Sequence, residues 1–418
     1  MKTSRRNFIG TAVAGSLAGI YPGTVFNKPG LKEKYAKLDE IIRLPVLKKE
    51  LFSTPVIIDT LELLRSGNNF LCRVRSRDGA TGISVANDDQ MKSLYPVFIN
   101  RLQGFFKGKD ARDLEKIIDE VYVYQSNYKM QNLALWVPLA TIEFAILDML
   151  GRISGKSLGE LIGTIHNRKI AVYQANGERD ISPEVTIEHM IREVNETGAK
   201  ALKFKVGGRM SSNYESPAGR SEKLIPLVRK TFGDKMVIYA DSNGSYTADE
   251  AIRIGKIMEE YKYDFYEEPV PFDWYEETKE VADALNIKVA GGEQEPSLHM
   301  FRWLIANDAV QVVQPDVFYF GGMIRSMKVA RMADAFGMEC TPHISGSGIG
   351  YLYMMHFVSA VPNAGPYHEF KGFNKSIPYS CSTSPLTSNE GVVIVPSGPG
   401  LGLDIDPAYV ARHKVVQA

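Results

Sequence analysis

Cysteine is scarce in this chain and neither sign of charge is in excess, and both features exclude whole classes of protein. Cys72, Cys340 and Cys381 are the three cysteines among 418 residues, too few and too scattered for a disulfide framework or a zinc site. Lys plus Arg and Asp plus Glu number 49 each, so the chain lacks the basic bias of proteins that bind nucleic acid or a membrane surface. Beyond the N-terminus we see no segment apolar enough to cross a membrane, and we expect no stable membrane insertion.

The N-terminus carries a pair of arginines, Arg5-Arg6, before a short apolar run at residues 11–20. Twin arginines before such a run are typical of a secretory signal, and the run is shorter than the roughly 20 residues that span a bilayer. The segment resembles a Tat signal, the export route for folded proteins. We therefore expect residues 1–30 to be a Tat-type leader and the protein to be periplasmic. If the segment is instead a disordered basic tail, the protein stays in the cytoplasm.

The next region, residues 31–167, has the mixed pattern of an α+β domain. Alternating apolar residues predict strands around a hairpin turn at Asp78-Gly79, and helical periodicity follows. A Ser-, Pro- and Gly-rich tail is expected to return to this domain, so that residues from about 375 to 418 complete it. The expected segments are strands at 53–64 and 69–86, helices at 90–106 and 111–124, and a buried helix at 138–151.

From residue 168 to about residue 374, short β-rich runs alternate with helical stretches. Repeated β-then-α units imply a parallel sheet, and eight of them favour a closed (β/α)7–8 barrel of the TIM type. An open doubly wound sheet is the alternative, but no Gly-rich phosphate-binding fingerprint follows the first run. The expected strands lie at 170–175, 201–206, 236–240, 264–266, 287–290, 309–313, 338–341 and 367–370.

Three acidic residues end consecutive strands of this predicted barrel. Asp241, Glu267 and Glu293 follow one another at an interval of 26 residues (267 − 241 and 293 − 267). One βα unit has about this length, so all three lie at the carboxyl ends of the strands, where barrel active sites form. Converging carboxylates repel one another unless a cation lies between them. Their oxygens suit Mg²⁺, for which Mn²⁺ could substitute, whereas zinc favours His or Cys. Asn243 could hydrogen-bond one of these carboxylates. Taken singly, each acid would be interpreted as an exposed loop residue.

Candidate bases end the strands on either side of these acids. Lys203 and Lys205 alternate with one residue between them, so both face the same side of their strand. Two nearby ammonium groups beside a metal should depress each other's pKa and bring one lysine toward a neutral, proton-accepting form. Asp316 and His343 end adjacent strands, where a carboxylate would fix the tautomer of the imidazole and raise its basicity. The arrangement suits acid–base chemistry on both faces of a carbon next to a carboxylate.

These motifs resemble the mandelate racemase branch of the enolase superfamily, the mandelate racemase/muconate lactonizing enzyme family. The resemblance covers roughly residues 45–405 and includes the apolar helix with Glu143 and Asp148, which resembles the end of the family's capping domain. Residue type, order and spacing all agree. The motifs are Lys203-Phe204-Lys205, Tyr239-Ala240-Asp241-Ser242-Asn243, Tyr266-Glu267-Glu268-Pro269, Gly291-Gly292-Glu293, Gln314-Pro315-Asp316 with Gly321-Gly322, and Pro342-His343.

The resemblance implies a role for each site residue. The three acids are expected to bind Mg²⁺, and Glu268 is expected to be a structural neighbour and not a ligand. Lys205 is expected to be the base on one face of the substrate. The roles of the remaining groups are as follows: Lys203 neutralises a substrate carboxylate oxygen and tunes Lys205, His343 paired with Asp316 is the acid or base on the other face, and Asn243 and Glu369 lie against the substrate.

The same residues serve several reactions after the α-proton has left to form an enediolate. We favour dehydration of a sugar acid to a 2-keto-3-deoxy acid. Racemisation or epimerisation of a 2-hydroxy or sugar acid and cycloisomerisation are the alternatives, and a non-catalytic sugar-acid-binding protein is the least favoured. The expected partner is a small-molecule carboxylate, and we also expect a homo-oligomer. The long polar loop at residues 207–220 is interpreted as a surface insertion, a lid or a subunit contact.

Overall fold

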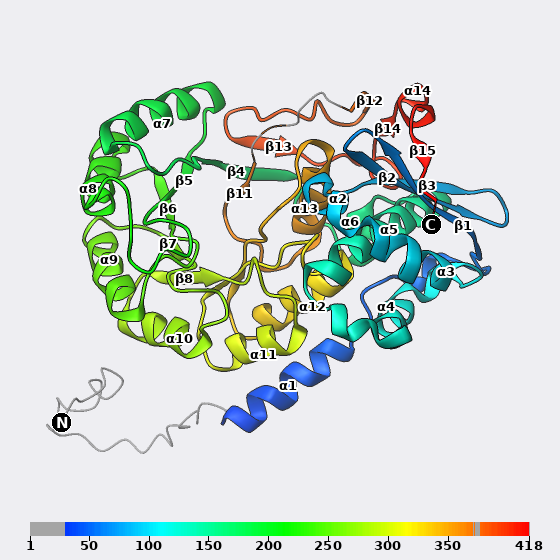
Figure 1. Ribbon diagram of the computed structural model, residues 1–418, viewed down its shortest axis with the longest axis horizontal. Coiled ribbons are helices and arrows are strands. Elements are labelled where there is room, and N and C mark those ends of the chain that lie inside the picture. Colours follow the sequence, from blue (N-terminus) through cyan, green and yellow to red (C-terminus); the bar gives the residue numbers. More distant parts are fainter. Residues whose placement is uncertain (1–29, 371, 373–376, 418) are drawn as a thin grey trace, which may run out of the picture.

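A ring of parallel strands with helices outside it forms one half of the protein, and a smaller α+β unit forms the other (Figure 1). The computed structural model describes residues 30–370, 372 and 377–417. The predicted Tat-type leader therefore lies, except for Gly30, outside the described residues. The ring consists of β4 (Lys169–Ala175), β5 (Ala201–Lys205), β6 (Val237–Asp241), β7 (Phe265–Glu267), β8 (Lys288–Gly291), β9 (Val312–Val313), β10 (Glu339–Cys340) and β11 (His368–Glu369).

All eight strands lie where the sequence predicted them, in the order β10-β9-β8-β7-β6-β5-β4-β11. The ring closes just before β11, because the Cys340 N–H donates to the Asn363 carbonyl (2.9 Å) and the Gly365 N–H donates to the Cys340 carbonyl (3.0 Å). The predicted TIM-type barrel is therefore confirmed. A strand that we did not predict, β13 (Val392–Ile394), pairs antiparallel with β4.

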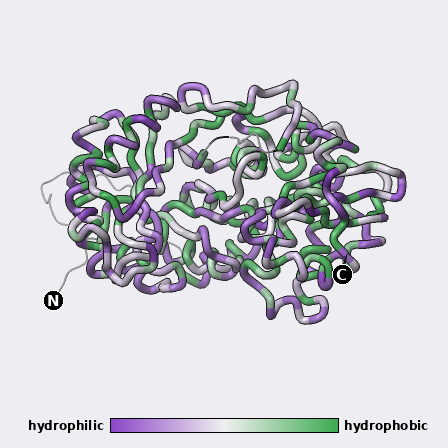
Figure 2. The backbone as a smooth tube through the Cα atoms, turned by 45° about the horizontal axis from the view of Figure 1, so that its top comes forward, coloured by the Kyte–Doolittle hydropathy of each residue, from purple (hydrophilic) through white to green (hydrophobic). Residues whose placement is uncertain are grey.

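The outer helices show the local signals that start and stop a helix. At α7 (Pro183–Thr197), the Ser182 side chain accepts the Val185 N–H, proline opens the first turn, and Gly198 ends the helix at φ +63°. Polar and apolar stretches alternate along the chain (Figure 2), as expected where helices bury one face on the barrel, whereas all residues of the last of these helices, α13 (Tyr351–Ala360), are buried. The others are α8 (Arg220–Phe232), α9 (Ala248–Glu260), α10 (Tyr275–Ala284), α11 (Leu298–Ala306) and α12 (Met323–Asp334).

The second unit is built on a four-stranded antiparallel sheet in the order β15-β1-β2-β3. Its strands are β1 (Ile58–Ser66), β2 (Asn69–Ser76), β3 (Thr81–Val85) and β15 (Lys414–Val415). Because β15 comes from the end of the chain and pairs with Leu64 and Arg65 of β1, the tail completes the sheet. The remaining elements are α2 (Asp88–Val97), α3 (Gln103–Phe106), α4 (Leu114–Val123), α6 (Leu158–Ile162), β12 (Tyr379–Ser380), β14 (Asp404–Ile405) and α14 (Pro407–Ala411). The exact boundary between the two units stays a prediction.

Helix α5 (Leu133–Ser154) packs against β2 and β3 and carries the core of this unit. It extends the buried helix predicted at 138–151 by a turn at its start. By length and composition alone it is apolar enough to cross a membrane, and it is the one such helix among the described residues. Within its apolar stretch of 18 residues, 89% is buried inside the protein. The prediction that no segment beyond the leader is that apolar was therefore wrong. The burial is what a core helix shows.

Helix α1 (Leu31–Arg43) was not predicted. It lies under the barrel, against α11 and α12 (Figure 1). The Lys34 ammonium donates to the Ala306 carbonyl (2.9 Å) and to Asp308 (3.0 Å). Leu38 is its one fully buried residue, so the apolar stripe by which a helix is recognised in sequence is narrow here.

Candidate active site

The three acids predicted to bind a metal lie side by side at the carboxyl ends of β6, β7 and β8. Asp241 and Glu267 are direct partners in the parallel register of β6 and β7, and Glu293 follows β8 after Gly292, whose φ of +111° few other residues adopt. One carboxylate oxygen from each acid lies within 4.8 Å of the others, and all three side chains are buried. Three convergent hard oxygens in a buried pocket are the donor set of a divalent-cation site. The cluster therefore fits a metal.

Burial and mutual repulsion shape the ionisation of these acids. Burial raises the pKa of Glu267 to about 7; Lys203 opposes the rise, while Asp241 and Glu293 add to it. Burial acts on Asp241 as well, but the ammonium groups of Lys205 and Lys203 outweigh it and hold the pKa of Asp241 below its ordinary value. A carboxylate that binds protons near neutral pH will also exchange that proton for a metal ion.

Each lysine of the predicted pair contacts its own carboxylate. The Lys203 ammonium donates to both oxygens of Glu267, at 2.9 and 2.8 Å, and the Lys205 ammonium donates to Asp241. Burial alone would lower the pKa of Lys203, but Glu267 and the other anionic groups around it raise that pKa well above its ordinary value. The expectation that the two lysines depress each other's pKa was wrong for Lys203, because carboxylates surround its ammonium.

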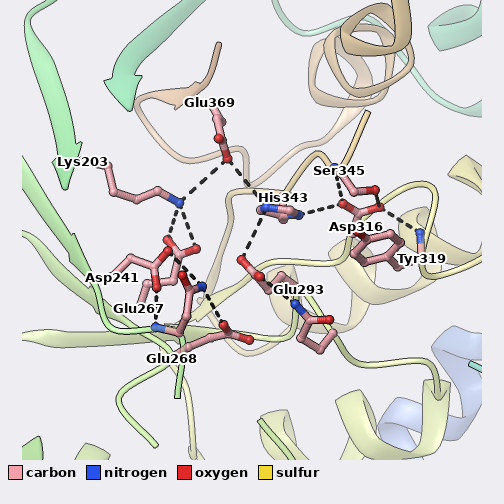
Figure 3. A network of polar contacts seen from close by, with 12 residues as sticks. Lys203, Asp241, Glu267, Glu268, Glu293, Asp316, Tyr319, His343, Ser345 and Glu369 are labelled. Atoms are coloured by element: carbon pink, nitrogen blue, oxygen red, sulfur yellow. Dashed lines mark hydrogen bonds and ion pairs between the residues drawn. The ribbon is translucent and has the colours of Figure 1, made fainter. Parts of the chain in front are cut away.

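His343 and Asp316 form the predicted pair across the ring from β5, after the ends of β10 and β9. His343 Nδ1 lies 2.7 Å from Asp316 Oδ2, and its Nε2 lies 3.5 Å from Glu293 Oε2. Figure 3 shows the imidazole between the two carboxylates. Burial would lower the pKa of His343, but Glu293 and Asp316 together raise it to about 10. The Ser345 and Tyr319 backbone N–H groups also donate to Asp316, so its position is held by several bonds.

Asn243 and Glu369, predicted to lie against the substrate, are both at the site. The Asn243 amide N–H₂ group donates to Asp241 (3.3 Å) and to Glu268 (3.1 Å), and its oxygen accepts from Arg179 (3.1 Å). Its side chain is thus engaged by the protein and holds a predicted metal ligand. Glu369 Oε2 lies 3.9 Å from both the Lys203 ammonium and His343 Nε2, between the two sides of the site (Figure 3).

Two further residues belong to this network: Glu268, which was predicted to be a structural neighbour and not a ligand, and Arg179, which the sequence did not single out. Glu268 is buried, Asn243 bonds one of its carboxylate oxygens, and the other has no partner among the described residues. Burial and the nearby Glu293 raise its pKa well above the ordinary value. The three acids that converge do not include Glu268, in agreement with its predicted place as a neighbour. Arg179 follows β4 in a loop, and no local pattern distinguishes it from an exposed arginine.

The site opens into a cavity of about 490 Å³, within the range of small-molecule pockets. Lys205, Glu293, His343 and Glu369 line it, together with Arg209 from the 207–220 loop. The loop therefore reaches the cavity wall, where a lid or a specificity element would lie. Lys203, Lys205 and Arg209 in the cavity wall, together with a cation held by the carboxylate cluster, would attract a small anionic substrate.

Comparisons with known proteins found a matching family model and similar enzymes. The family model described as enolase C-terminal domain-like matches residues 186–409. A D-galactarolactone cycloisomerase of Agrobacterium fabrum is 27% identical over 326 residues, 76% of this chain and 84% of that enzyme. An arabinonate dehydratase of Saccharolobus solfataricus is 25% identical over 310 residues, 73% of this chain and 79% of that enzyme.

Solved structures share the fold. A protein of Roseobacter denitrificans matches with a TM-score of 0.78 and 30% identity, covering 86% of this chain and 99% of its own. A mandelate racemase/muconate lactonizing protein of Paracoccus denitrificans, complexed with magnesium, matches with a TM-score of 0.77 and 24% identity, covering 87% of this chain and 99% of its own.

Proposed function

The chain belongs to the enolase C-terminal domain-like family, and we propose that it is an Mg²⁺-dependent enzyme that removes a proton next to a carboxylate. One observation carries the proposal. Three buried carboxylates converge within 4.8 Å between Lys205 on one side of the ring and the His343–Asp316 pair on the other. A protein that only binds a sugar acid needs neither Lys205 nor the His343–Asp316 pair. Proton transfer at carbon, in contrast, needs a base and often an acid on the other face.

In the proposed reaction, Asp241, Glu267 and Glu293 hold Mg²⁺. When bound, the ion acts as a Lewis acid toward the substrate carboxylate and stabilises the charge that develops as the proton leaves. Lys205, which is open to the cavity, releases its own proton to solvent and then accepts the α-proton through Nζ. Lys203 lies beside Glu267 and contributes positive charge near the substrate carboxylate.

We propose that the reaction is dehydration of a sugar acid to a 2-keto-3-deoxy acid. His343, hydrogen-bonded through Nδ1 to Asp316, then donates its Nε2 proton to the departing β-hydroxyl, and water leaves. The arabinonate dehydratase relative supports this choice. The cycloisomerase relative supports the alternative in which an oxygen of the substrate itself is the nucleophile or leaving group. Racemisation would require His343 to return a proton to the α-carbon.

The experiment is a panel of five- and six-carbon sugar acids, including arabinonate, incubated with and without Mg²⁺. Mg²⁺-dependent formation of a keto acid supports dehydration, and keto acid from none of the panel would refute it. Change of optical rotation without keto acid would instead support racemisation or epimerisation. In the same panel, a galactarolactone tests cycloisomerisation.

Lys205→Met tests the proposed base directly. We expect exchange of the substrate α-hydrogen with D₂O to fall at least about 10²-fold, as for loss of a general base, while Mg²⁺ binding persists. Lys200→Met is the matched control, because Lys200 precedes the same strand but is exposed. Exchange that survives in Lys205→Met would show that another group removes the proton.

We also propose that Arg5-Arg6 directs Tat export to the periplasm and that the enzyme is a homo-oligomer. Cell fractionation of the wild-type chain and an Arg5→Lys, Arg6→Lys double variant tests the first proposal. Equal periplasmic recovery of both would contradict it. Light scattering of the purified protein tests the second, and a monomeric mass would contradict it.

A further inference from the structure

The structure assigns a positioning role to Asn87, a residue of the smaller unit, in holding the His343–Asp316 pair of the barrel. Asn87 is the N-cap of α2, and its side-chain oxygen accepts the Gln90 N–H (3.2 Å). Its amide N–H₂ group points the other way, to Ser345 in the segment that follows β10. The assignment rests on the proposed function, in which His343 is a proton donor.

Hydrogen bonds connect Asn87 to His343 in three steps. Asn87 Nδ2 donates to the carbonyl (3.2 Å) and to the hydroxyl oxygen (3.1 Å) of Ser345. Ser345 in turn donates its N–H to Asp316 Oδ2 (2.6 Å) and its hydroxyl to Asp316 Oδ1 (3.0 Å). Asp316 Oδ2 lies 2.7 Å from His343 Nδ1. A hydroxyl both donates and accepts, so Ser345 can make all of these bonds at once.

The segment that carries Ser345 depends on these bonds for its position. Residues 341–347 form neither helix nor strand, so no ladder of backbone bonds fixes them. Ser345 and His343 lie on this same segment, and Asp316 lies just after β9, the strand beside β10 in the ring (Figure 3). Asn87 is buried. Its amide oxygen accepts from Gln90 and its amide nitrogen donates to Ser345, so the amide has one orientation. It therefore ties both the segment and the carboxylate to the smaller unit.

Catalysis is sensitive to such placement, because a shift of about 1 Å in a reacting group can lower a rate about 10²-fold. Loss of the Asn87 bonds should let the Ser345 segment move and displace the imidazole from the departing hydroxyl. Lys205, held on the far side of the ring by Asp241, should be unaffected. We therefore expect the proton transfer from His343 to be impaired and the proton transfer to Lys205 to be unchanged.

Asn87→Asp is the decisive variant. Aspartate keeps the N-cap oxygen for Gln90 and nearly the same volume, but it has no N–H to donate to Ser345. Ser345→Ala is the second variant, because it removes the middle hydroxyl and keeps the backbone N–H. Asp89→Asn is the matched control, since Asp89 is an exposed residue of the same first turn of α2. Thermal unfolding of each variant establishes that it is folded.

The first measurement needs no substrate. A downfield proton NMR signal from His343 Nδ1–H, assigned by its loss in His343→Gln, should be present in the wild type and in Asp89→Asn. We expect it to shift or broaden in Asn87→Asp and in Ser345→Ala. An unchanged signal in folded Asn87→Asp overturns the inference, whether or not any sugar acid is a substrate.

The second measurement uses a sugar acid that the wild type converts. We expect Asn87→Asp to lower kcat for keto-acid formation about 10- to 100-fold, with KM and α-hydrogen exchange within about twofold of the wild type. Equal loss of exchange and dehydration would overturn the inference, because the damage would then reach both sides of the site. Absence of any converted acid would count against the proposed function, while the NMR result still decides the role of Asn87.

Discussion

Glu143, at the junction of the two units, offers a sharp test of how burial controls ionisation in this protein. It lies on α5, and its Oε1 accepts the backbone N–H groups of Met323 and Ile324 in the first turn of α12. Its Oε2 has no partner in the part of the chain that the structure describes. Burial raises the pKa of Glu143 from 4.5 to about 8, although the two N–H groups oppose the rise.

The sign and size of the effect on stability follow from this difference in pKa. The folded chain keeps a proton on Glu143 that the unfolded chain releases above pH 4.5, so stability is full below that pH and is lost as the pH rises through about 8. At about 1.36 kcal/mol for each pH unit between the two pKa values, the complete loss is about 5 kcal/mol. Between about pH 6 and about pH 9 it is about 3 kcal/mol.

Glu143→Gln isolates this contribution, because the amide keeps an oxygen for Met323 and Ile324 but does not ionise. We expect urea unfolding to show that the free energy of unfolding of the variant, relative to the wild type, rises by about 3 kcal/mol between pH 6 and pH 9. Glu188→Gln, at an exposed position of α7, should show no such rise. If the difference in unfolding free energy between the wild type and Glu143→Gln stays constant with pH, the conclusion that Glu143 is buried and protonated is refuted.

Further predictions concern the metal cluster and a close contact. Mg²⁺ at 100 times its Kd should stabilise the protein by about 2.7 kcal/mol, chelation should reverse this, and Asp241→Asn should lose most of the effect in thermal unfolding. Because the pKa of Glu267 is about 7, protons compete with Mg²⁺, and calorimetry should show Kd rising up to about tenfold for each pH unit below 7. A Kd that does not vary between about pH 6 and 8 would contradict this. In Gly322→Ala the added Cβ would lie 2.3 Å from the Glu143 carboxylate at a φ of +117°, so we expect at least about 2 kcal/mol of destabilisation. Gly337→Ala, at φ +69° with open space around it, measures a milder positive-φ strain without any contact, and an equal loss in both variants would rule out the contact as the cause.

Spacing along the chain was enough to predict the barrel and the convergence of Asp241, Glu267 and Glu293. A parallel βα unit has a nearly constant length, so acids that recur at the interval of one unit must meet at the same end of the ring. The helix α1 and the strand β13 were not predictable in this way. Leu38 is the one fully buried residue of α1. Strand β13 forms its backbone hydrogen bonds only because the tail of the chain returns to β4.

The tertiary structure decided which side chains that are distant in sequence contact one another. The sequence placed Lys203 beside Lys205, but the fold surrounds Lys203 with carboxylates and so reverses the expected direction of its pKa shift. Nothing local indicates that Asn87 meets Ser345, 258 residues away. Residue type and interval are local properties of the chain, and they determined which groups line the barrel mouth. Hydrogen bonds and desolvation depend on which segments pack together, and only the folded chain contains that information.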